Sequence, residues 1–360
     1  MARLGDYVRI RTGKLDANAS SENGRYPFFT CAVEPLRIDS YSYDCECVLV
    51  AGNGDLNVKY YNGKFDAYQR TYIIESIDKS VLSVPYLYFF LDKYVETLRY
   101  EAIGGVIKYI KLGNLTEAQI PLLSLEEQAK VVCEIDKAND LISLRKQQLA
   151  KLDELVKARF VELFGGISDS KIYPYKTVKE LTDVISGGTP SREVNEYWEN
   201  GTIPWVKTTE LQNNVITEID EYITKAGLDN SSAKLVPAGT ILIAMYGQGK
   251  TRGMTGYLGV EACTNQACAC ILPSGSINQK FLWQYFVLSY DYLRDMAKGG
   301  NQPNLNSNII KNYPVLYPPI ELQNQFATFV KQVDKSKLAI QQSLDRLELL
   351  KKALMQKYFG

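Results

Sequence analysis

Apolar residues recur at steps of four and three along two stretches of the chain, one within residues 124–166 and the other within residues 320–360. This spacing places the apolar side chains on one narrow face of an α-helix, which is the pattern of a coiled-coil seam. The seam positions are Val131, Ile135, Ala138, Ile142, Leu149, Leu152, Val156 and Leu163 in the first stretch, and Phe326, Val330, Val333, Ile340, Leu344, Leu347, Leu354 and Tyr358 in the second. The pattern predicts two long helices that pair through their apolar faces.

The two helical stretches repeat each other at an offset of 195 residues. At this offset Leu125-Glu-Glu-Gln128 aligns with Ile320-Glu-Leu-Gln323. Without a gap, the same offset also aligns Gln147, Leu149, Leu152, Leu155, Lys157, Ala158, Phe164 and Gly165 with Gln342, Leu344, Leu347, Leu350, Lys352, Ala353, Phe359 and Gly360. The chain therefore contains an internal repeat.

Charged residues interrupt both seams, at Arg145 and Arg159 in the first copy and at Lys337 and Lys351 in the second. Each of them aligns with an apolar residue of the other copy. This arrangement favours pairing of the two helices with each other over pairing of each helix with its own kind.

Short strand-like runs alternate with turns in the segments outside the helices, which are rich in Tyr, Val, Ile, Thr, Gly and Asn. We predict a first domain over residues 1–123, a helical region over 124–166, a second domain over 167–319 and a second helical region over 320–360. Because each domain leads directly into a helix, the second helix must run back along the first. The expected fold is α+β: two mixed α/β domains separated by two long antiparallel helices that form a coiled coil with pseudo-two-fold symmetry.

Composition adds little to this picture, since 41 basic and 41 acidic residues give a formal net charge of zero. A surface for nucleic acid would have to arise from segregated charge. No stretch approaches the roughly 18 apolar residues of a membrane span, so we expect no membrane association. The N-terminus resembles no signal peptide, and we expect a cytoplasmic protein.

The seven cysteines are an odd number, and Cys45-x-Cys47 and Cys268-x-Cys270 have the spacing of alternating strand positions, not of zinc ligands. We interpret them as buried free thiols and expect no metal site.

Catalytic motifs are lacking, and we expect no catalytic residues. Gly249-Lys-Thr251 follows an apolar run, but a phosphate-binding loop needs a further glycine where Ala244 stands and a helix afterwards, whereas the sequence from Arg252 indicates a turn and a strand. The chain has no histidine, which excludes histidine-based catalytic sites and metal sites. The Asn/Asp-Pro-Pro-Tyr element of methyltransferases is also missing.

Both predicted domains carry loops with amide, hydroxyl, basic and aromatic side chains, the groups that contact base edges and phosphates. Each such residue alone is more often an ordinary turn residue or a solvated charge. The candidate DNA-binding residues of the first domain are Lys14, Asn53, Asn57, Lys59, Tyr60, Gln69, Arg70 and Lys108. Those of the second domain are Thr189, Ser191, Arg192, Lys207, Thr208, Tyr246, Gln248, Lys250, Thr251, Arg252, Asn265, Gln266, Asn301, Gln302 and Asn304.

Several motifs in order give the chain, over essentially its whole length, a resemblance to the specificity subunit of type I restriction-modification systems. In the second domain they are Gly201-Thr-Ile-Pro-Trp-Val206, Gly239-Thr-Ile-Leu-Ile-Ala-Met-Tyr-Gly247, Thr264-Asn-Gln-Ala267 and Gly300-Asn-Gln-Pro-Asn-Leu305. In the first they are Tyr26-Pro-Phe-Phe-Thr30, Val48-Leu-Val-Ala-Gly-Asn-Gly54, Asn57-Val-Lys-Tyr-Tyr-Asn-Gly63 and Tyr68-Gln-Arg-Thr71. The helices open with Pro121-Leu-Leu-Ser-Leu-Glu-Glu-Gln128 and Pro318-Pro-Ile-Glu-Leu-Gln323. The first domain departs from the pattern in having no Ile-Pro-Trp element.

The resemblance implies a non-catalytic subunit that binds double-stranded DNA, with each target-recognition domain contacting one half of a bipartite target. It also implies two methyltransferase subunits bound along the helices and two motor-nuclease subunits. S-adenosylmethionine, ATP and Mg²⁺ are then expected on these partners and not on this chain. Two other functions stay open: a free-standing DNA-binding regulator, and a structural coiled-coil adaptor without DNA contact.

Overall fold

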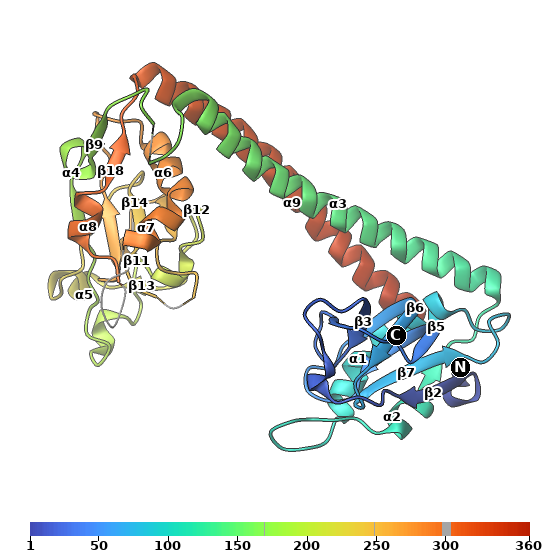
Figure 1. The fold of residues 1–360 in the computed structure, drawn as a ribbon. Helices are drawn as coiled ribbons and strands as arrows, with labels where there is room; N and C mark the ends of the chain where they lie inside the picture. Colours follow the sequence, from blue (N-terminus) through green and yellow to red (C-terminus); the bar gives the residue numbers. More distant parts are fainter. Residues whose placement is uncertain (169, 248, 297–303) are drawn as a thin grey trace. The chain divides into compact units, whose positions relative to one another are not determined.

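The computed structural model of the chain describes residues 1–168, 170–247, 249–296 and 304–360. The chain forms two compact units (Figure 1): the first holds residues 1–148 and 340–360, and the second holds residues 149–339. Each unit contains one α/β domain and parts of two helices of 40 residues, α3 (Leu125–Phe164) and α9 (Ile320–Phe359). The fold is α+β, as the sequence predicts.

In the first unit, the two long helices pair in antiparallel fashion. Arg145 Nε donates to Ser343 Oγ at 3.2 Å, and Tyr358 OH donates to Glu134 Oε2 at 2.7 Å. Residue numbers thus rise along one helix and fall along the other. The predicted antiparallel pair is confirmed here.

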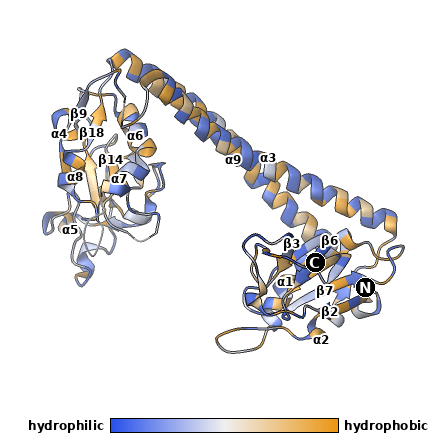
Figure 2. Ribbon diagram, in the orientation of Figure 1, coloured by the Kyte–Doolittle hydropathy of each residue, from blue (hydrophilic) through white to orange (hydrophobic). Residues whose placement is uncertain are grey.

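The same pairing holds in the second unit. Lys337 forms an ion pair with Asp153, and the Arg159 guanidinium lies 6.0 Å from the centroid of the Phe329 ring. The seam charges Arg145, Arg159 and Lys337 are therefore matched by polar or aromatic groups. Every predicted apolar seam residue is buried or half-buried, and Figure 2 shows apolar and polar residues interspersed along both helices.

The first domain is built on a six-stranded sheet with the order β2-β7-β5-β6-β3-β4, and a two-stranded sheet pairs β1 with β8. Its strands are β1 (Ala2–Arg3), β2 (Val8–Thr12), β3 (Tyr26–Phe29), β4 (Leu36–Ile38), β5 (Tyr43–Ala51), β6 (Val58–Ala67), β7 (Thr71–Ser76) and β8 (Gln119–Ile120). Its helices are α1 (Val84–Glu101) and α2 (Leu112–Thr116).

The second domain holds a five-stranded sheet with the order β10-β17-β14-β15-β12, a three-stranded sheet with the order β13-β11-β16, and the pair β18-β9. Its strands are β9 (Tyr175–Thr177), β10 (Val184–Ser186), β11 (Ile203–Val206), β12 (Asn214–Ile216), β13 (Tyr222–Ile223), β14 (Ile241–Ala244), β15 (Thr255–Leu258), β16 (Cys263–Thr264), β17 (Cys268–Ile271) and β18 (Pro314–Leu316). Its helices are α4 (Val178–Leu181), α5 (Lys225–Asp229), α6 (Gln279–Leu288), α7 (Tyr290–Met296) and α8 (Ser307–Lys311).

The two domains share a central arrangement of four strands. The order β2-β7-β5-β6 in the first corresponds to β10-β17-β14-β15 in the second, and all these neighbours are antiparallel. In both domains a helix from the following segment packs on this sheet, α1 on β5 and β6 and α6 on β15. The internal repeat therefore extends from the helices into the domains.

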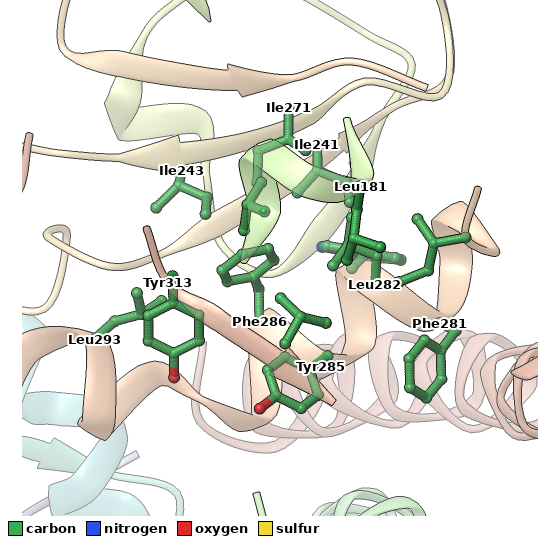
Figure 3. Packing of buried hydrophobic residues seen from close by; sticks show 14 of the residues in the cluster. Leu181, Ile241, Ile243, Ile271, Phe281, Leu282, Tyr285, Phe286, Leu293 and Tyr313 are labelled. Atoms are coloured by element: carbon green, nitrogen blue, oxygen red, sulfur yellow. The ribbon is translucent and has the colours of Figure 1, made fainter. Parts of the chain in front are cut away.

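Each domain core continues into the long helices of its own unit. In the second unit, Ile241, Ile243 and Ile271 of the sheet lie toward Phe286 of α6, whereas Phe281 lies farther from the sheet (Figure 3). Val156, Phe160 and Phe164 of α3 and Phe326, Val330 and Val333 of α9 belong to the same buried cluster. In the first unit, the corresponding cluster joins α1 to Val131, Ile135, Met355 and Phe359.

A buried glutamine joins each long helix to its domain. Gln128 Nε2 donates to the carbonyls of Val81 and Leu123 at 2.7 and 2.9 Å, and its Oε1 accepts from the Ser83 N–H at 2.9 Å. At the repeat offset, Gln323 Nε2 donates to the Pro318 carbonyl at 2.8 Å, and its Oε1 accepts from the Asn278 N–H at 2.8 Å.

The cysteines lie largely where the sequence places them. The paired cysteines alternate on β5 and β17, all seven thiols are free, and Cys47, Cys263, Cys268 and Cys270 are buried. Burial raises the pKa of Cys263 to about 11. The expectation of burial is wrong for Cys133, which is exposed because it lies off the seam of α3, and Cys31 and Cys45 are only half-buried.

Two further sequence expectations concern helices. The glycine-rich turn after β14 leads into the strand β15 and not into a helix, which confirms the argument against a phosphate-binding loop. Within the described ranges, none of the helices combines the length and apolar character that crossing a membrane requires.

Candidate nucleic-acid interface

Five candidate residues of the first domain come together where β2 and β5 end and β7 begins. The Gly13 N–H donates to the Thr71 carbonyl at 3.1 Å, and the Gly52 N–H donates to the Arg70 carbonyl at 2.8 Å. The Gly54 N–H donates to the Lys108 carbonyl at 2.9 Å, which adds the segment before α2. We call this region the first-domain edge; its candidate residues are Lys14, Asn53, Gln69, Arg70 and Lys108.

The first-domain edge presents an amide and cationic groups to solvent. Lys14, Gln69, Arg70 and Lys108 are exposed, and Gln69 Nε2 donates to Asp16 Oδ1 at 2.7 Å. A polar cavity of about 280 Å³ opens here, lined by Thr12, Gly52, Gln69, Arg70, Tyr72 and Ile110. This combination suits contacts to base edges and to phosphates.

Close backbone packing explains the glycines of the edge. A Cβ on Gly13 would lie 2.1 Å from the Ala67 carbonyl oxygen, and a Cβ on Gly52 would lie 2.4 Å from the Arg70 carbonyl oxygen. Only glycine lets the two strand ends approach the segment before β7 this closely. The glycines therefore fix the position of Gln69 and Arg70.

Three other candidates of the first domain have internal partners. Asn57 Nδ2 donates to the Cys31 carbonyl at 2.8 Å, and Asn57 Oδ1 accepts from Lys59. Burial lowers the pKa of Lys59. Tyr60 lies on the α1 side of the sheet, and its hydroxyl donates to Glu46 Oε1 at 2.8 Å. Burial and this hydrogen bond raise the pKa of Tyr60 to about 12. The structure does not bring Tyr60 to the first-domain edge.

The second domain assembles a similar edge around the end of β14 and the start of β17. The Met245 N–H donates to the Ala267 carbonyl at 2.8 Å, the Gly187 N–H donates to the Cys268 carbonyl at 3.3 Å, and the Met245 carbonyl accepts from the Leu305 N–H at 3.0 Å. We call this region the second-domain edge; its candidate residues are Thr189, Tyr246, Asn265, Gln266 and Asn304.

The two edges contain an equivalent turn. The Tyr68 carbonyl accepts from the Thr71 N–H at 2.8 Å, and the Asn265 carbonyl accepts from the Cys268 N–H at 3.1 Å. Both turns enter corresponding strands, β7 and β17. The turn places one glutamine in each domain at the same position, Gln69 and Gln266.

Both glutamines are exposed and tied to the segment that follows the first strand of their sheet. Gln69 donates to Asp16, and Gln266 accepts a hydrogen bond from the Thr189 hydroxyl. Because the side-chain amide both donates and accepts, it can pair with the matching groups of an adenine edge. The pair of glutamines is the common chemical feature of the two edges.

The loop between β14 and β15 carries Lys250, Thr251 and Arg252 beside the second-domain edge. Tyr290 OH donates to the Lys250 carbonyl at 2.7 Å, and Arg294 donates to the Arg252 carbonyl at 2.8 Å. Helix α7 thus holds the backbone of this loop, while the Lys250 side chain is exposed. The candidate Gln248 of the same loop lies outside the described residues, as do Asn301 and Gln302.

Arg192 and Lys207 form an ion cluster with Glu221. Arg192 Nη2 lies 2.6 Å from Glu221 Oε2, Lys207 Nζ lies 2.9 Å from Glu221 Oε1, and the Arg192 guanidinium lies 3.6 Å from the centroid of the Trp198 ring. Burial raises the pKa of Glu221, but the hydrogen bonds from Lys207 and Arg192 outweigh it, so that the pKa is lowered overall. These two cations already have internal partners. Nearby, Ser191 is exposed and Thr208 is half-buried.

A family model described as "Type I restriction modification DNA specificity domain" matches residues 1–154 and 173–349, which is most of the chain. The chain belongs to this family. Each matched region contains one of the two edges and the start of one long helix.

Curated relatives agree with this family. The specificity subunit of the type I restriction enzyme EcoDI from Escherichia coli is 38% identical over 154 residues, which are 43% of this chain and 34% of that subunit. The EcoR124I/EcoR124II specificity subunit from E. coli is 26% identical over 78% of this chain and 70% of that subunit. This chain thus matches about a third of the first relative's length.

Solved structures share the fold. The type I restriction-modification S subunit from M. genitalium superposes with a TM-score of 0.65 at 17% identity, covering all of this chain (100%) and 95% of that one. A second structure, described as the basis of complex assembly and conformational transition of the type I restriction-modification system, has a TM-score of 0.60 at 18% identity and covers 99% of this chain and 96% of that one.

One feature of this family member was missed from the sequence. The segment between α1 and α2 forms a loop whose residues Val106 and Ile107 are exposed, and its base is bound to the first-domain edge. The pair Gly104-Gly105 before two apolar residues was the pattern that could have indicated a turn with an apolar tip.

Proposed function

We propose that this chain is the DNA-reading subunit of a type I restriction-modification complex, and that each domain contacts one half of a bipartite target. The supporting observation is the duplicated edge: two family domains each place an exposed glutamine in the same turn, beside cationic side chains. Amides and guanidinium groups distinguish base edges, while lysines bind phosphates and set the register on DNA.

Single substitutions at the two edges provide the test. We expect Gln69→Ala or Arg70→Ala to relax selectivity in one half of the target only, and Gln266→Ala to relax it in the other half only. Lys250→Ala should weaken methylation without relaxing selectivity, since lysines bind phosphates. A lost base contact should cost about 1–3 kcal/mol of discrimination. The measurement is mapping of N6-methyladenine on a plasmid after co-expression with a methyltransferase subunit.

Controls for this test come from charged residues distant from the edges, such as Lys93→Ala on α1, which pairs with Glu96. Unchanged methylation for all four edge variants would contradict the proposal. A complex that assembles but methylates no split motif would favour the regulator, and the lack of salt-dependent retention on duplex DNA would favour the adaptor.

We further propose that two copies of a methyltransferase subunit dock on equivalent grooves. A groove of about 380 Å³ in the first unit lies between α1 and α3 and is lined by Tyr60, Pro85, Tyr88, Phe89, Val132 and Asp136. A groove of about 490 Å³ in the second unit lies between α6 and α9 and is lined by Asn278, Lys280, Trp283, Gln284, Asn324, Ala327, Thr328, Val330, Lys331 and Asp334.

The repeat relates the two grooves residue by residue. At the offset of 195, Pro85, Tyr88, Phe89, Val132 and Asp136 align with Lys280, Trp283, Gln284, Ala327 and Lys331. A duplicated groove is suited to two copies of one partner. The aligned aromatic residues Tyr88 and Trp283 are half-buried and 3% exposed, respectively, so they form the walls of the grooves, while the aligned Asp136 and Lys331 are exposed to a partner.

Charge reversal at one equivalent pair of positions tests the docking. We expect Asp136→Arg to remove one methyltransferase copy, Lys331→Glu to remove one, and the double variant to remove both, because both positions are exposed at a groove. Native mass spectrometry of the co-expressed complex reports the stoichiometry. Lys137→Glu and Gln332→Glu, at the adjacent equivalent positions, are the matched controls; two copies retained by the double variant would refute the assignment.

S-adenosylmethionine, ATP and Mg²⁺ would be bound by the methyltransferase and motor-nuclease partners, and this chain would position the DNA for them. Two motor-nuclease subunits complete the proposed complex. Since the proposed substrate is cellular or invading DNA, we place the chain in the cytoplasm.

A further inference from the structure

The loop between α1 and α2 is held firmly at its base. Ile103 and Tyr109 exchange two backbone hydrogen bonds of 3.0 and 2.9 Å, and the Ile110 N–H donates to the Gly52 carbonyl at 3.0 Å. Asn53 forms a further bridge to Tyr109. The base of the loop is thus continuous with the first-domain edge, and Figure 1 shows the loop extending away from the sheet beside α2.

The tip of the loop holds two β-branched side chains in solvent. Val106 is fully exposed and Ile107 is 62% exposed. Gly104 has a φ of +121°, and a Cβ there would lie 2.6 Å from the Ile107 carbonyl oxygen, so the turn requires glycine. β-Branched side chains have few rotamers, and ordering them against a ligand therefore costs little entropy. A closed turn with a stiff apolar tip is well suited to contacting a partner.

The charge around the tip favours DNA as this partner. Residues 102–111 include Lys108 and Lys111 and no acidic residue. Gln69 and Arg70 lie on the other side of Gly52 and line the polar cavity with Ile110. The loop therefore carries its apolar tip on a base that adjoins groups suited to phosphates and base edges.

We propose that Val106 and Ile107 contact thymine in the first half of the target, through its C5-methyl group in the major groove. This inference rests on the proposed DNA-reading function. The thymine methyl is the apolar group that base edges present in that groove, whereas the amide and guanidinium groups of the edge contact polar atoms. The tip adds an apolar contact that Gln69 and Arg70 cannot make.

The experiment pairs protein variants with methyl deletion in the DNA. The target duplex is first selected from a random pool with the full-length wild-type chain, and each thymine of the first half-site is then replaced by deoxyuridine. Fluorescence anisotropy at fixed salt gives Kd for wild type, Val106→Thr, the double variant Val106→Ala/Ile107→Ala, and the control Ile77→Ala. Ile77 is 62% exposed and follows the end of β7 opposite to Arg70.

For the wild type and for Ile77→Ala, we expect deoxyuridine at one or more positions to weaken binding by about threefold to tenfold, in line with loss of a buried methyl. For the double variant, binding to the thymine duplex should weaken similarly and the deoxyuridine effect should vanish. Val106→Thr keeps the shape of the side chain and should show an intermediate loss. Hydrogen exchange in α1 and β7 that matches the wild type verifies that the first domain of each variant is folded.

Two results would overturn the inference. One is a first half-site without thymine. The other is a deoxyuridine effect that persists in the double variant, because the tip would then act in another way, for example as a wedge between base steps. These results differ from failure of the proposed function. That failure would appear as a wild-type chain that selects no sequence at all.

Discussion

At the scale of single residues, the two buried glutamines explain why the repeat is so clear at the start of each long helix. Gln128 has no exposed surface and satisfies two backbone carbonyls and one N–H, which belong to two separate segments, residues 81–83 and Leu123. Gln323 does the same at the repeat offset, with two bonds. Only a side-chain amide offers both a donor and an acceptor at this reach, which restricts the position to glutamine.

We expect Gln128→Ala to lower the free energy of unfolding of the first unit by about 3 kcal/mol, because it leaves buried backbone groups without partners. Hydrogen-exchange mass spectrometry across a urea series measures this value for the segments around α1. The exposed Gln147→Ala on the same helix should change it by less than about 0.5 kcal/mol. Equal effects of the two substitutions would count against the role of Gln128.

At the scale of elements, residues at the C-terminal ends of the two long helices pack in the hydrophobic cores of the domains. The Phe359 ring of α9 lies 5.1 Å from the Tyr86 ring and 6.2 Å from the Phe90 ring of α1. The Phe164 ring of α3, its equivalent in the repeat, lies 5.3 Å from the Phe281 ring of α6. Each helix therefore starts in one domain core and ends in the other.

This packing predicts opposite effects of two matched substitutions. The chain has three tryptophans, Trp198, Trp205 and Trp283, and all lie in the second unit. Phe164→Ala should therefore lower the free energy of unfolding of the second unit by about 3 kcal/mol, which appears as a lower urea midpoint of tryptophan fluorescence. Phe359→Ala should leave this midpoint near the wild-type value.

The loss caused by Phe359→Ala should instead appear as faster hydrogen exchange in α1. If both substitutions shift the tryptophan transition equally, the units do not unfold separately and the prediction is wrong.

At the scale of the whole molecule, the chain passes twice from one compact unit to the other, each time within an unbroken helix of 40 residues. The first unit is not a continuous segment, since it consists of residues 1–148 and 340–360, whereas the second runs without a break from residue 149 to residue 339. If the domains contact two half-sites, the length of the helical pair should set the spacer between them.

We expect insertion of one heptad after Gln148 and another after Ala339 to lengthen the spacer of the methylated target by about three base pairs, since seven helical residues add about 10 Å. Both insertions keep the apolar seam in register. Methylation mapping of co-expressed variants measures the spacer. A heptad inserted in α3 alone is the control and should disrupt the helical pair. An unchanged spacer after the double insertion would refute the idea that the length of the helical pair sets the spacer.

The helices, their seam, their antiparallel pairing and the family could be predicted from the sequence, because a heptad pattern and a repeat are properties of neighbouring positions along the chain. Residue types at the edges were also predictable, since glycine-rich turns with amides and cations stand out in the sequence. These patterns do not predict which residues of neighbouring strands a given residue contacts.

Only the tertiary structure decided which candidate residues lie close together in the two edges. It pairs Asn57 with Lys59, and it pairs Tyr60 with Glu46 on the α1 side of the sheet. It also places Gln69 and Gln266 in the same turn although they are 197 residues apart and the repeat offset is 195, because loops of different length precede equivalent strands. The equivalence of Gln69 and Gln266 follows from hydrogen bonds between segments that are distant along the chain. The local sequence does not predict these bonds.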